Sequence, residues 1–230
     1  MVKHLPTLLH IDSSANSKHS VSRKLTSEFV ADWLNLNPGY LVKYRNLAVN
    51  PVAGITGDLL ETLFAPPGTE HPEAKHAVLA AADSVIDEFL SADHYVFGVP
   101  MYNFSVPAAF KAYMDQIVRV GRTMGRGPKG LEGLVKGKKL LIISTRSGDY
   151  SPGAPRDGWD FHEPYLRKFF GWLGIEDITY IPVIHNPAHG DAEAQARRVE
   201  LTEARLKETA ARWKVEAVSP SRIAPDAVRA

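Results

Sequence analysis

Short apolar runs alternate with longer amphipathic stretches along most of the chain. The run Leu140, Leu141, Ile142 and Ile143 is continuously apolar, as strands buried on both faces are. Between such runs, apolar residues recur every three or four positions, which places them on one face of a helix. The pattern predicts strands over residues 8–11, 40–44, 94–99, 139–144 and 178–184, and helices over residues 22–36, 58–63, 73–90, 106–120, 161–173 and 192–213.

The regular order of strand and helix predicts the fold class. Strands separated by helices form right-handed βαβ units, which build a parallel sheet with helices on both faces. We therefore expect an α/β protein whose ligand site lies at the carboxyl ends of the strands. Residues 1–214 read as one domain. Residues 215–230, which include Pro220 and Pro225 among small polar residues, are expected to form a flexible tail.

Composition narrows the classes of function. The chain of 230 residues has a formal net charge of +1, so no overall field draws it to nucleic acid or anionic lipid. No apolar run approaches the roughly 20 residues of a membrane span, and the N-terminus lacks the apolar core of a signal peptide. The chain has no cysteine, which fits a reducing, cytoplasmic location. Its histidines show no metal-ligand spacing, so no metal is expected.

Three loops of unusual composition follow the first, third and fourth predicted strands. Residues 12–22 are rich in serine and lead into a helix, so hydroxyls meet the free amides of a helix N-terminus and can bind an anion. The loop lacks the G-x-G-x-x-G motif of dinucleotide sites, so a monophosphate fits better. Residues 100–105 offer aromatic faces beside an amide, and residues 144–153 combine glycine with small hydroxyl residues. Each loop alone is typical of a turn, an N-cap or a cover for the sheet end. Three such loops at the same edge of the predicted sheet indicate a site for an aromatic ligand that carries a phosphate.

The segment Pro100-Met101-Tyr102-Asn103-Phe104 resembles the matching segment of the FMN-dependent NADH-azoreductase and quinone-reductase family. Neighbouring stretches agree with this resemblance. Ser13 and Ser14, followed by residues 20–22, are similar to the phosphate loop of the family. Residues 130–139 are similar to its lead-in to the fourth strand, and residues 163–175 to its penultimate helix. The resemblance runs from the N-terminus to about residue 213.

The resemblance implies a flavodoxin-like, doubly wound sheet of five parallel strands in the order 2-1-3-4-5, with helices on both faces. It also implies a homodimer with two FMN sites near the interface. The first loop would hold the FMN phosphate, the second would flank the isoalloxazine ring, and the third would contact the polar edge of the ring. The residues carried over are Ser14, Ser20, Val21 and Ser22, then Met101, Tyr102, Asn103 and Phe104, and finally Thr145, Arg146, Ser147 and Gly148.

Two positions depart from the pattern of the family. Ser147 stands where relatives commonly have glycine, which would narrow the approach of the backbone to the ring. Met124 stands where relatives often have a phenylalanine over the substrate pocket. Met124 and Tyr150 are therefore expected in that pocket, where they would affect substrate preference.

The function implied is that of an FMN-dependent NAD(P)H oxidoreductase that reduces quinones, azo compounds or both. NADH or NADPH would reduce the flavin and leave, and the acceptor would then take two electrons in the same pocket, in a ping-pong hydride transfer. Because the flavin carries the difficult chemistry, no catalytic acid is assigned to the protein.

Two alternatives remain open. A flavodoxin-type electron carrier would share the fold, although such carriers tend to be strongly acidic and this chain has a net charge of +1. A serine hydrolase would use Ser13 or Ser14 with Asp12, and His185 or His189 as the base. The G-x-S-x-G segment that commonly presents such a serine is absent.

Overall fold

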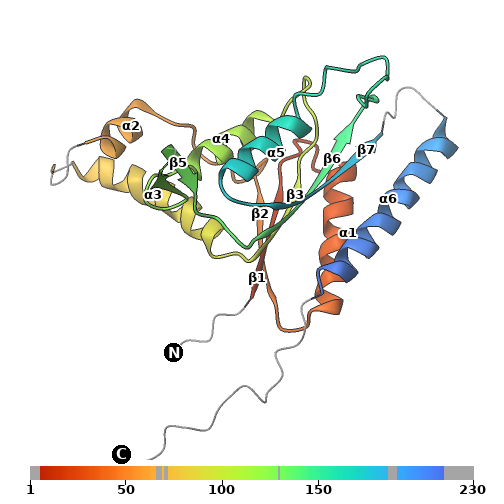
Figure 1. Cartoon of the computed structure of the whole chain (residues 1–230), viewed down its shortest axis with the longest axis horizontal. Coiled ribbons are helices and arrows are strands. Elements are labelled where there is room, and N and C mark those ends of the chain that lie inside the picture. Colours follow the sequence, from red (N-terminus) through yellow and green to blue (C-terminus); the bar gives the residue numbers. More distant parts are fainter. Residues whose placement is uncertain (1–5, 66–68, 70–71, 129, 186–190, 215–230) are drawn as a thin grey trace, which may run out of the picture.

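The computed structural model describes residues 6–65, 69, 72–128, 130–185 and 191–214. Its main sheet has five parallel strands in the order β2-β1-β3-β6-β7 (Figure 1). The strands of this sheet are β1 (Thr7–Asp12), β2 (Leu41–Asn46), β3 (His94–Gly98), β6 (Lys139–Arg146) and β7 (Asp177–Ile184). The helices are α1 (Val21–Leu36), α2 (Gly57–Leu63), α3 (Glu73–Leu90), α4 (Ala108–Gln116), α5 (Glu163–Trp172) and α6 (Ala192–Arg212).

This topology confirms the predicted fold class. The strands β6 and β7 are the fourth and fifth of the main sheet, because β4 and β5 form a separate two-stranded sheet. The order is therefore 2-1-3-4-5, as the resemblance implied. Every residue of β1 and β3 is buried, which explains why consecutive positions such as Leu8 and Leu9, or Val96 and Phe97, are apolar and do not alternate with polar ones.

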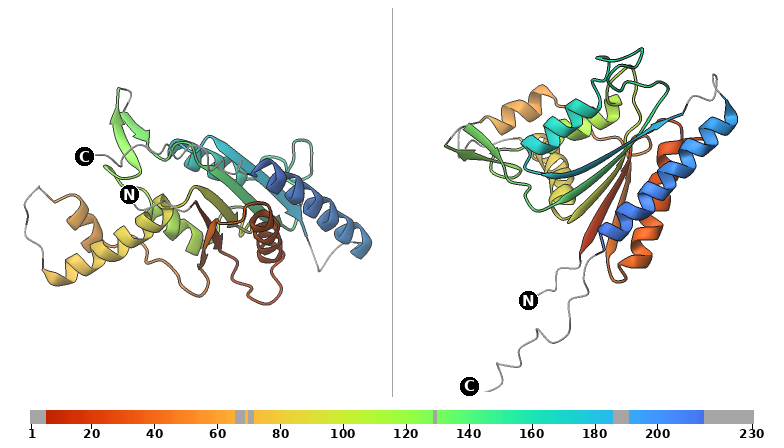
Figure 2. Two further views of the ribbon diagram at one scale, coloured as in Figure 1. Left: turned by 90° about the horizontal axis from the view of Figure 1, so that it is seen from below. Right: turned by 45° about the vertical axis from the view of Figure 1, so that its right-hand side comes forward.

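Helices cover both faces of the sheet (Figure 2). On one face, α1 and α6 pack together over the sheet, with Phe29, Trp33 and Trp213 buried between helices and strands. On the other face, α3, α4 and α5 surround a second core that contains Phe110 and Phe170. The two cores together hold the sheet rigid, so the loops at the ends of its strands start from well-defined positions.

A short antiparallel hairpin, β4 (Met124–Gly127) and β5 (Gly130–Gly133), was not predicted. The helix predicted over residues 106–120 ends earlier than expected, at Gln116. Thr123 explains the early end, because its hydroxyl donates to the Ile117 carbonyl at 2.6 Å and accepts from the Arg119 amide at 2.9 Å. The chain is thereby turned out of the helix and into the hairpin.

In the part of the chain that the structure describes, no helix is both long and apolar enough to cross a membrane. The flexible tail predicted for residues 215–230 lies outside the described residues.

Candidate functional site

The three predicted loops meet at the carboxyl edge of β1, β3 and β6. A cavity of about 390 Å³ opens between them. The predicted residues that line this cavity are Ser14, Ser20, Val21, Met101, Tyr102, Thr145, Arg146 and Ser147. The structure thus brings into one place most of the residues that the resemblance assigned to a cofactor.

The first loop ends at the N-terminus of α1. The Asn16 side chain accepts from the amides of Lys18 and His19, at 3.1 and 2.9 Å, and closes a turn. Ser20 then caps the helix, since its hydroxyl accepts from the Arg23 amide at 3.3 Å. Amide groups and the positive end of the helix dipole meet the hydroxyls here, which favours an anion.

Ser22 lies deeper than the resemblance implied. Its side chain is fully buried, and its hydroxyl is 3.1 Å from the hydroxyl of Ser20. Ser22 therefore supports Ser20 from behind, whereas Ser14 and Ser20 line the cavity themselves.

The second loop has an unusual backbone. Tyr102 and Ser105 exchange two backbone hydrogen bonds of 2.9 and 3.0 Å, and between them Asn103 and Phe104 have φ values of 48° and 69°. Left-handed backbone is uncommon for any residue with a side chain, and it is costly for a bulky one such as Phe104. Strain of this kind persists where the surroundings hold it in place, often at functional sites.

Hydrogen bonds tie the second loop to its two neighbours. The Ala15 amide donates to the Tyr102 hydroxyl at 3.1 Å, which joins the first loop to the second. The Met101 amide donates to the Thr145 carbonyl at 2.8 Å, which joins the second loop to the third. The cavity walls are therefore linked to one another as well as to the sheet.

Arg146 begins the third loop and is almost completely buried. Its guanidinium donates to Asp160 at 2.7 Å and to the Tyr180 hydroxyl, and it lies over the rings of Tyr150 and Tyr180. Burial would lower the pKa of Arg146, but the charge of Asp160 and the Tyr180 hydroxyl raise it, so the group stays charged. The side chain that was expected to contact a flavin is therefore also a structural anchor.

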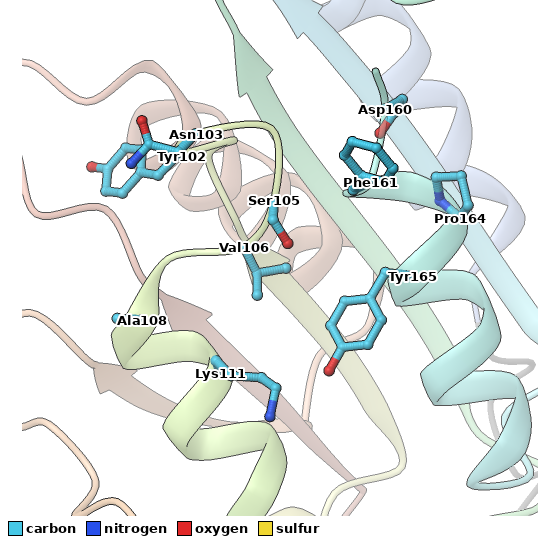
Figure 3. A pocket seen from close by; sticks show the side chains of 10 residues that line it. All are labelled: Tyr102, Asn103, Ser105, Val106, Ala108, Lys111, Asp160, Phe161, Pro164 and Tyr165. Carbon is cyan, nitrogen blue, oxygen red and sulfur yellow. The ribbon is translucent and has the colours of Figure 1, made fainter. Parts of the chain in front are cut away.

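A larger cavity of about 860 Å³ shares Tyr102 with the first as a lining residue. Figure 3 shows the side chains that line the larger cavity. Phe161, which precedes α5, and Pro164 and Tyr165 in the first turn of α5 face Val106 across it. The walls are mainly apolar and aromatic, which suits a flat organic molecule. A third cavity of about 180 Å³ completes the group, lined by Met101, Asn103, Phe104, Ser147, Tyr150 and Arg156.

The two residues expected in the substrate pocket have different positions. Tyr150 lines the smallest cavity, and its ring lies 6.3 Å from that of Phe104. The Met124 side chain is instead fully buried in the core formed with α3, α4 and α5, because β4 turns it inward. Gly148 faces Arg156, whose guanidinium would be 3.0 Å from a Cβ at this position.

Sequence reasoning did not assign several residues that line the cavities. Asn16, His19 and Pro100 flank predicted positions and could have been included on that ground. His185 follows β7, the strand beside β6, so its place at the same edge was a usable signal. Phe161 reaches the site only because α5 packs back toward the second loop, which no local pattern reveals.

The geometry bears also on the hydrolase alternative. The Ser13 hydroxyl donates to the Gly98 carbonyl at 2.9 Å and is 2% exposed, which is not the setting of an attacking nucleophile. Of the two histidines considered as the base of a hydrolase, His185 lines the cavity and His189 lies outside the described residues. Within the described ranges, no group of three or more potential metal ligands is gathered in one place.

Comparison with known proteins agrees with this geometry. A family model described as a flavodoxin-like fold matches residues 6–208. The chain is 45% identical over 208 residues to an FMN-dependent NADH:quinone oxidoreductase of Nostoc punctiforme, covering 90% of this chain and 98% of that protein. It is 48% identical over 178 residues to an FMN-dependent NADH:quinone oxidoreductase 2 of Trichormus variabilis, covering 77% and 86%. Among solved structures, the azoreductase AzrA superposes with a TM-score of 0.81 at 26% identity, covering 90% and 100%.

Proposed function

The chain belongs to the family of FMN-dependent NADH:quinone oxidoreductases with a flavodoxin-like fold, and on this premise we propose that it reduces quinones and azo compounds with electrons from NADH or NADPH. One observation carries the proposal. A cavity with hydroxyls and a helix N-terminus at one end joins, at Tyr102, a larger cavity with aromatic walls. A phosphate with a flat ring system needs that combination.

The residues present fit flavin mononucleotide. Ser14 and Ser20, at the start of α1, would hold the phosphate, with Val21 beside them and Ser22 behind. The bent backbone of Met101, Tyr102, Asn103 and Phe104 would flank the ring. Thr145, Arg146, Ser147 and Gly148 would border its polar edge, with the Arg146 guanidinium as a fixed positive charge close by.

Bound FMN would supply the redox chemistry, accepting two electrons from the nicotinamide donor and delivering them to the acceptor. The task of the protein is to orient the reacting rings and to keep them in an apolar setting. The cavity of about 860 Å³ is the place proposed for the nicotinamide and then for the acceptor, since Phe161 and Tyr165 offer ring faces there. Solvent would protonate the product, so no catalytic acid is assigned.

A homodimer is part of the proposal. Trp159 and Phe161, on the rim of the site, are 54% and 61% exposed, and large aromatic side chains exposed together are typical of protein interfaces. A second copy that covers them would close the larger cavity. A cytoplasmic location also belongs to the proposal, because the reaction depends on a soluble nicotinamide donor.

The test begins with the purified chain and added FMN. Flavin absorption bands at about 370 and 450 nm that bleach when NADH is added without oxygen would establish the cofactor and the donor. Steady oxidation of NADH on addition of benzoquinone or methyl red would then separate an enzyme from an electron carrier. A protein that remains colourless with FMN and oxidises neither NADH nor NADPH in the presence of a quinone would contradict the proposal.

A further inference from the structure

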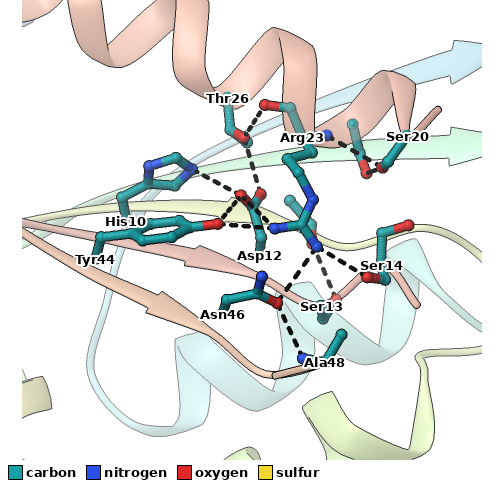
Figure 4. A network of polar contacts seen from close by, with 12 residues as sticks. His10, Asp12, Ser13, Ser14, Ser20, Arg23, Thr26, Tyr44, Asn46 and Ala48 are labelled. Atoms are coloured by element: carbon teal, nitrogen blue, oxygen red, sulfur yellow. Dashed lines mark hydrogen bonds and ion pairs between the residues drawn. The ribbon is translucent and has the colours of Figure 1, made fainter. Parts of the chain in front are cut away.

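A buried carboxylate lies beneath the proposed phosphate loop. Asp12 is the last residue of β1, two positions before Ser14, and it is only 1% exposed. One of its oxygens accepts from the Thr26 hydroxyl at 2.9 Å, and the other accepts from the Tyr44 hydroxyl at 3.0 Å (Figure 4). His10 Nε2 is 3.4 Å from that second oxygen. An unbalanced negative charge at this point would oppose the binding of a phosphate dianion.

Arg23, in the first turn of α1, supplies the balancing charge. Its Nη1 is 3.5 Å from Asp12 and donates to the Tyr44 hydroxyl at 2.7 Å. Its Nη2 donates to the Ser14 carbonyl at 2.9 Å and to the Asn46 side chain at 3.3 Å. Both terminal nitrogens are thus engaged with the protein, so Arg23 acts from behind the loop and is not itself a ligand of the phosphate.

The bond to Ser14 has a second effect. Because Arg23 binds the Ser14 carbonyl, the negative end of that peptide points toward the guanidinium and away from the anion site. Tyr44 supports the same arrangement, since burial and the charge of Asp12 raise the pKa of its phenol, which therefore stays protonated and donates to Asp12. Arg23, Asp12 and Tyr44 form one polar network behind Ser14 and Ser20 (Figure 4).

We propose that Arg23 is a positioning residue for the cofactor phosphate, which makes the loop selective for a phosphorylated flavin by neutralising Asp12 and turning the Ser14 carbonyl away from the phosphate. The inference rests on the proposed FMN site. It differs from that proposal because it concerns only the phosphate end, and it assigns the selectivity to a side chain that does not touch the ligand.

The experiment compares the dissociation constants of FMN and riboflavin, measured by quenching of flavin fluorescence. Riboflavin shares the ring and the ribityl chain of FMN and lacks only the phosphate. In Arg23→Gln we expect the dissociation constant for FMN to rise at least about tenfold, and that for riboflavin to change less than about twofold, because an uncompensated buried charge acts on the anion alone. The matched control is Arg45→Gln on β2, which breaks the partly buried pair with Glu88 of α3 and should leave both constants unchanged.

The double variant Asp12→Asn/Arg23→Gln removes both charges. It should recover a substantial part of the FMN binding that Arg23→Gln loses, at least about threefold, because the charge is balanced again although the bond to the Ser14 carbonyl is not. A merely structural role of Arg23 would produce no such recovery. Arg23→Lys keeps the charge and should retain more of the preference for FMN than Arg23→Gln does. It also provides a test if the glutamine variant folds poorly by circular dichroism.

Three results would overturn the inference while leaving the proposed function intact: equal loss of FMN and riboflavin binding in Arg23→Gln, no recovery in the double variant, or Arg23→Lys as defective as Arg23→Gln. If the wild-type protein binds neither flavin, the proposed function itself fails, and this inference fails with it.

Discussion

At the scale of single residues, the site depends on conformations that composition alone does not reveal. Asn103 and Phe104 have left-handed backbone, which costs on the order of 1–3 kcal/mol for each residue. Neighbours hold them there: the Phe161 amide donates to the Phe104 carbonyl at 3.2 Å, and the Trp159 ring packs edge-on at 5.1 Å from that of Phe104. The sequence indicated aromatic residues at this edge, but their backbone follows from contacts with distant segments.

Gly98 shows how closely packed the floor of the site is. A Cβ here would lie 2.6 Å from Asp12 Oδ1 and 3.2 Å from Thr26 Cγ2. We expect Gly98→Ala to lower the free energy of unfolding by about 1–3 kcal/mol, since overpacking forces neighbours out of position. Urea denaturation measures this change.

Gly171→Ala is the matched control for this substitution. Gly171 lies in α5 with nothing within 4 Å of an added Cβ, so alanine there should leave stability unchanged or raise it by up to about 1 kcal/mol. A Gly98→Ala protein as stable as the wild type would mean that Asp12 can move without cost.

Some site residues could be identified from the sequence and others could not. Ser14, Ser20 and Tyr102 lie in loops that follow predicted strands, and position along the chain was enough to bring them together. Met124 was assigned by its place in the family pattern, but the direction of its side chain depends on the hairpin, which was not predicted. The flavin contacts of all these residues stay predictions.

At the scale of elements, periodicity was a good guide to the sheet and its helices and a poor one to the hairpin. In β1, β3 and β6 apolar residues follow one another without alternating with polar ones, because both faces of these strands are buried, so the signal is strong. Residues 124–133 contain glycine and charged residues in place of alternating β-formers, and they pair because the ends of the hairpin are fixed elsewhere. The Leu134 amide donates to the Thr123 carbonyl and the Val135 amide to the Leu173 carbonyl, both at 2.9 Å.

Gly133 is the point at which the hairpin contacts the end of α5. A Cβ on Gly133 would lie 2.1 Å from the carbonyl carbon of Leu173, so the backbone itself would have to move. We expect Gly133→Ala to destabilise the protein by at least about 2 kcal/mol, more than Gly98→Ala, where a side chain can yield. Thermal denaturation followed by circular dichroism tests this order, and the reverse order would contradict it.

At the scale of the whole molecule, the two edges of the sheet have different tasks. The carboxyl edge carries the cavities and the strained loop. The opposite edge is closed by His94 at the start of β3, whose ring contacts those of Trp33, Tyr40 and Trp213. The cavities and this aromatic cluster therefore lie at opposite edges of one sheet, and the predicted topology indicated only the first of these two edges.

Two buried histidines make the stability of the whole molecule depend on pH in the acid range. Burial, reinforced by nearby Lys139, lowers the pKa of His94 to about 4, and burial with Arg146 does the same for His162. The unfolded chain takes up these protons near pH 6.5. The part of the folding stability that depends on both histidines being neutral is therefore fully present above about pH 6.5 and is lost as the pH falls toward 4.

We expect the free energy of unfolding to fall by on the order of 3 kcal/mol for each of the two histidines across that interval. His94→Gln should reduce the slope of stability against pH, and His94→Gln/His162→Gln should remove most of it. Urea titrations at half-unit steps from pH 4 to 7 measure the slope. A slope identical in the wild type and both variants would show that other groups control the response to acid.

The ion pair between Arg146 and Asp160 affects which insertions and deletions the sequence can accept during evolution. Arg146 Nη1 and Asp160 Oδ2 are 2.7 Å apart, so the two ends of the loop formed by residues 147–159 are held close together. For a loop whose ends are held together, doubling the number of residues adds only about 0.6 kcal/mol to the entropic cost of closing it. This segment carries Tyr150, Arg156 and Trp159 to the rim of the site. Insertions and deletions beyond Gly148 can therefore alter which acceptors the proposed pocket admits, while the sheet and the residues proposed to hold the cofactor, Ser147 and Gly148 included, are inherited unchanged.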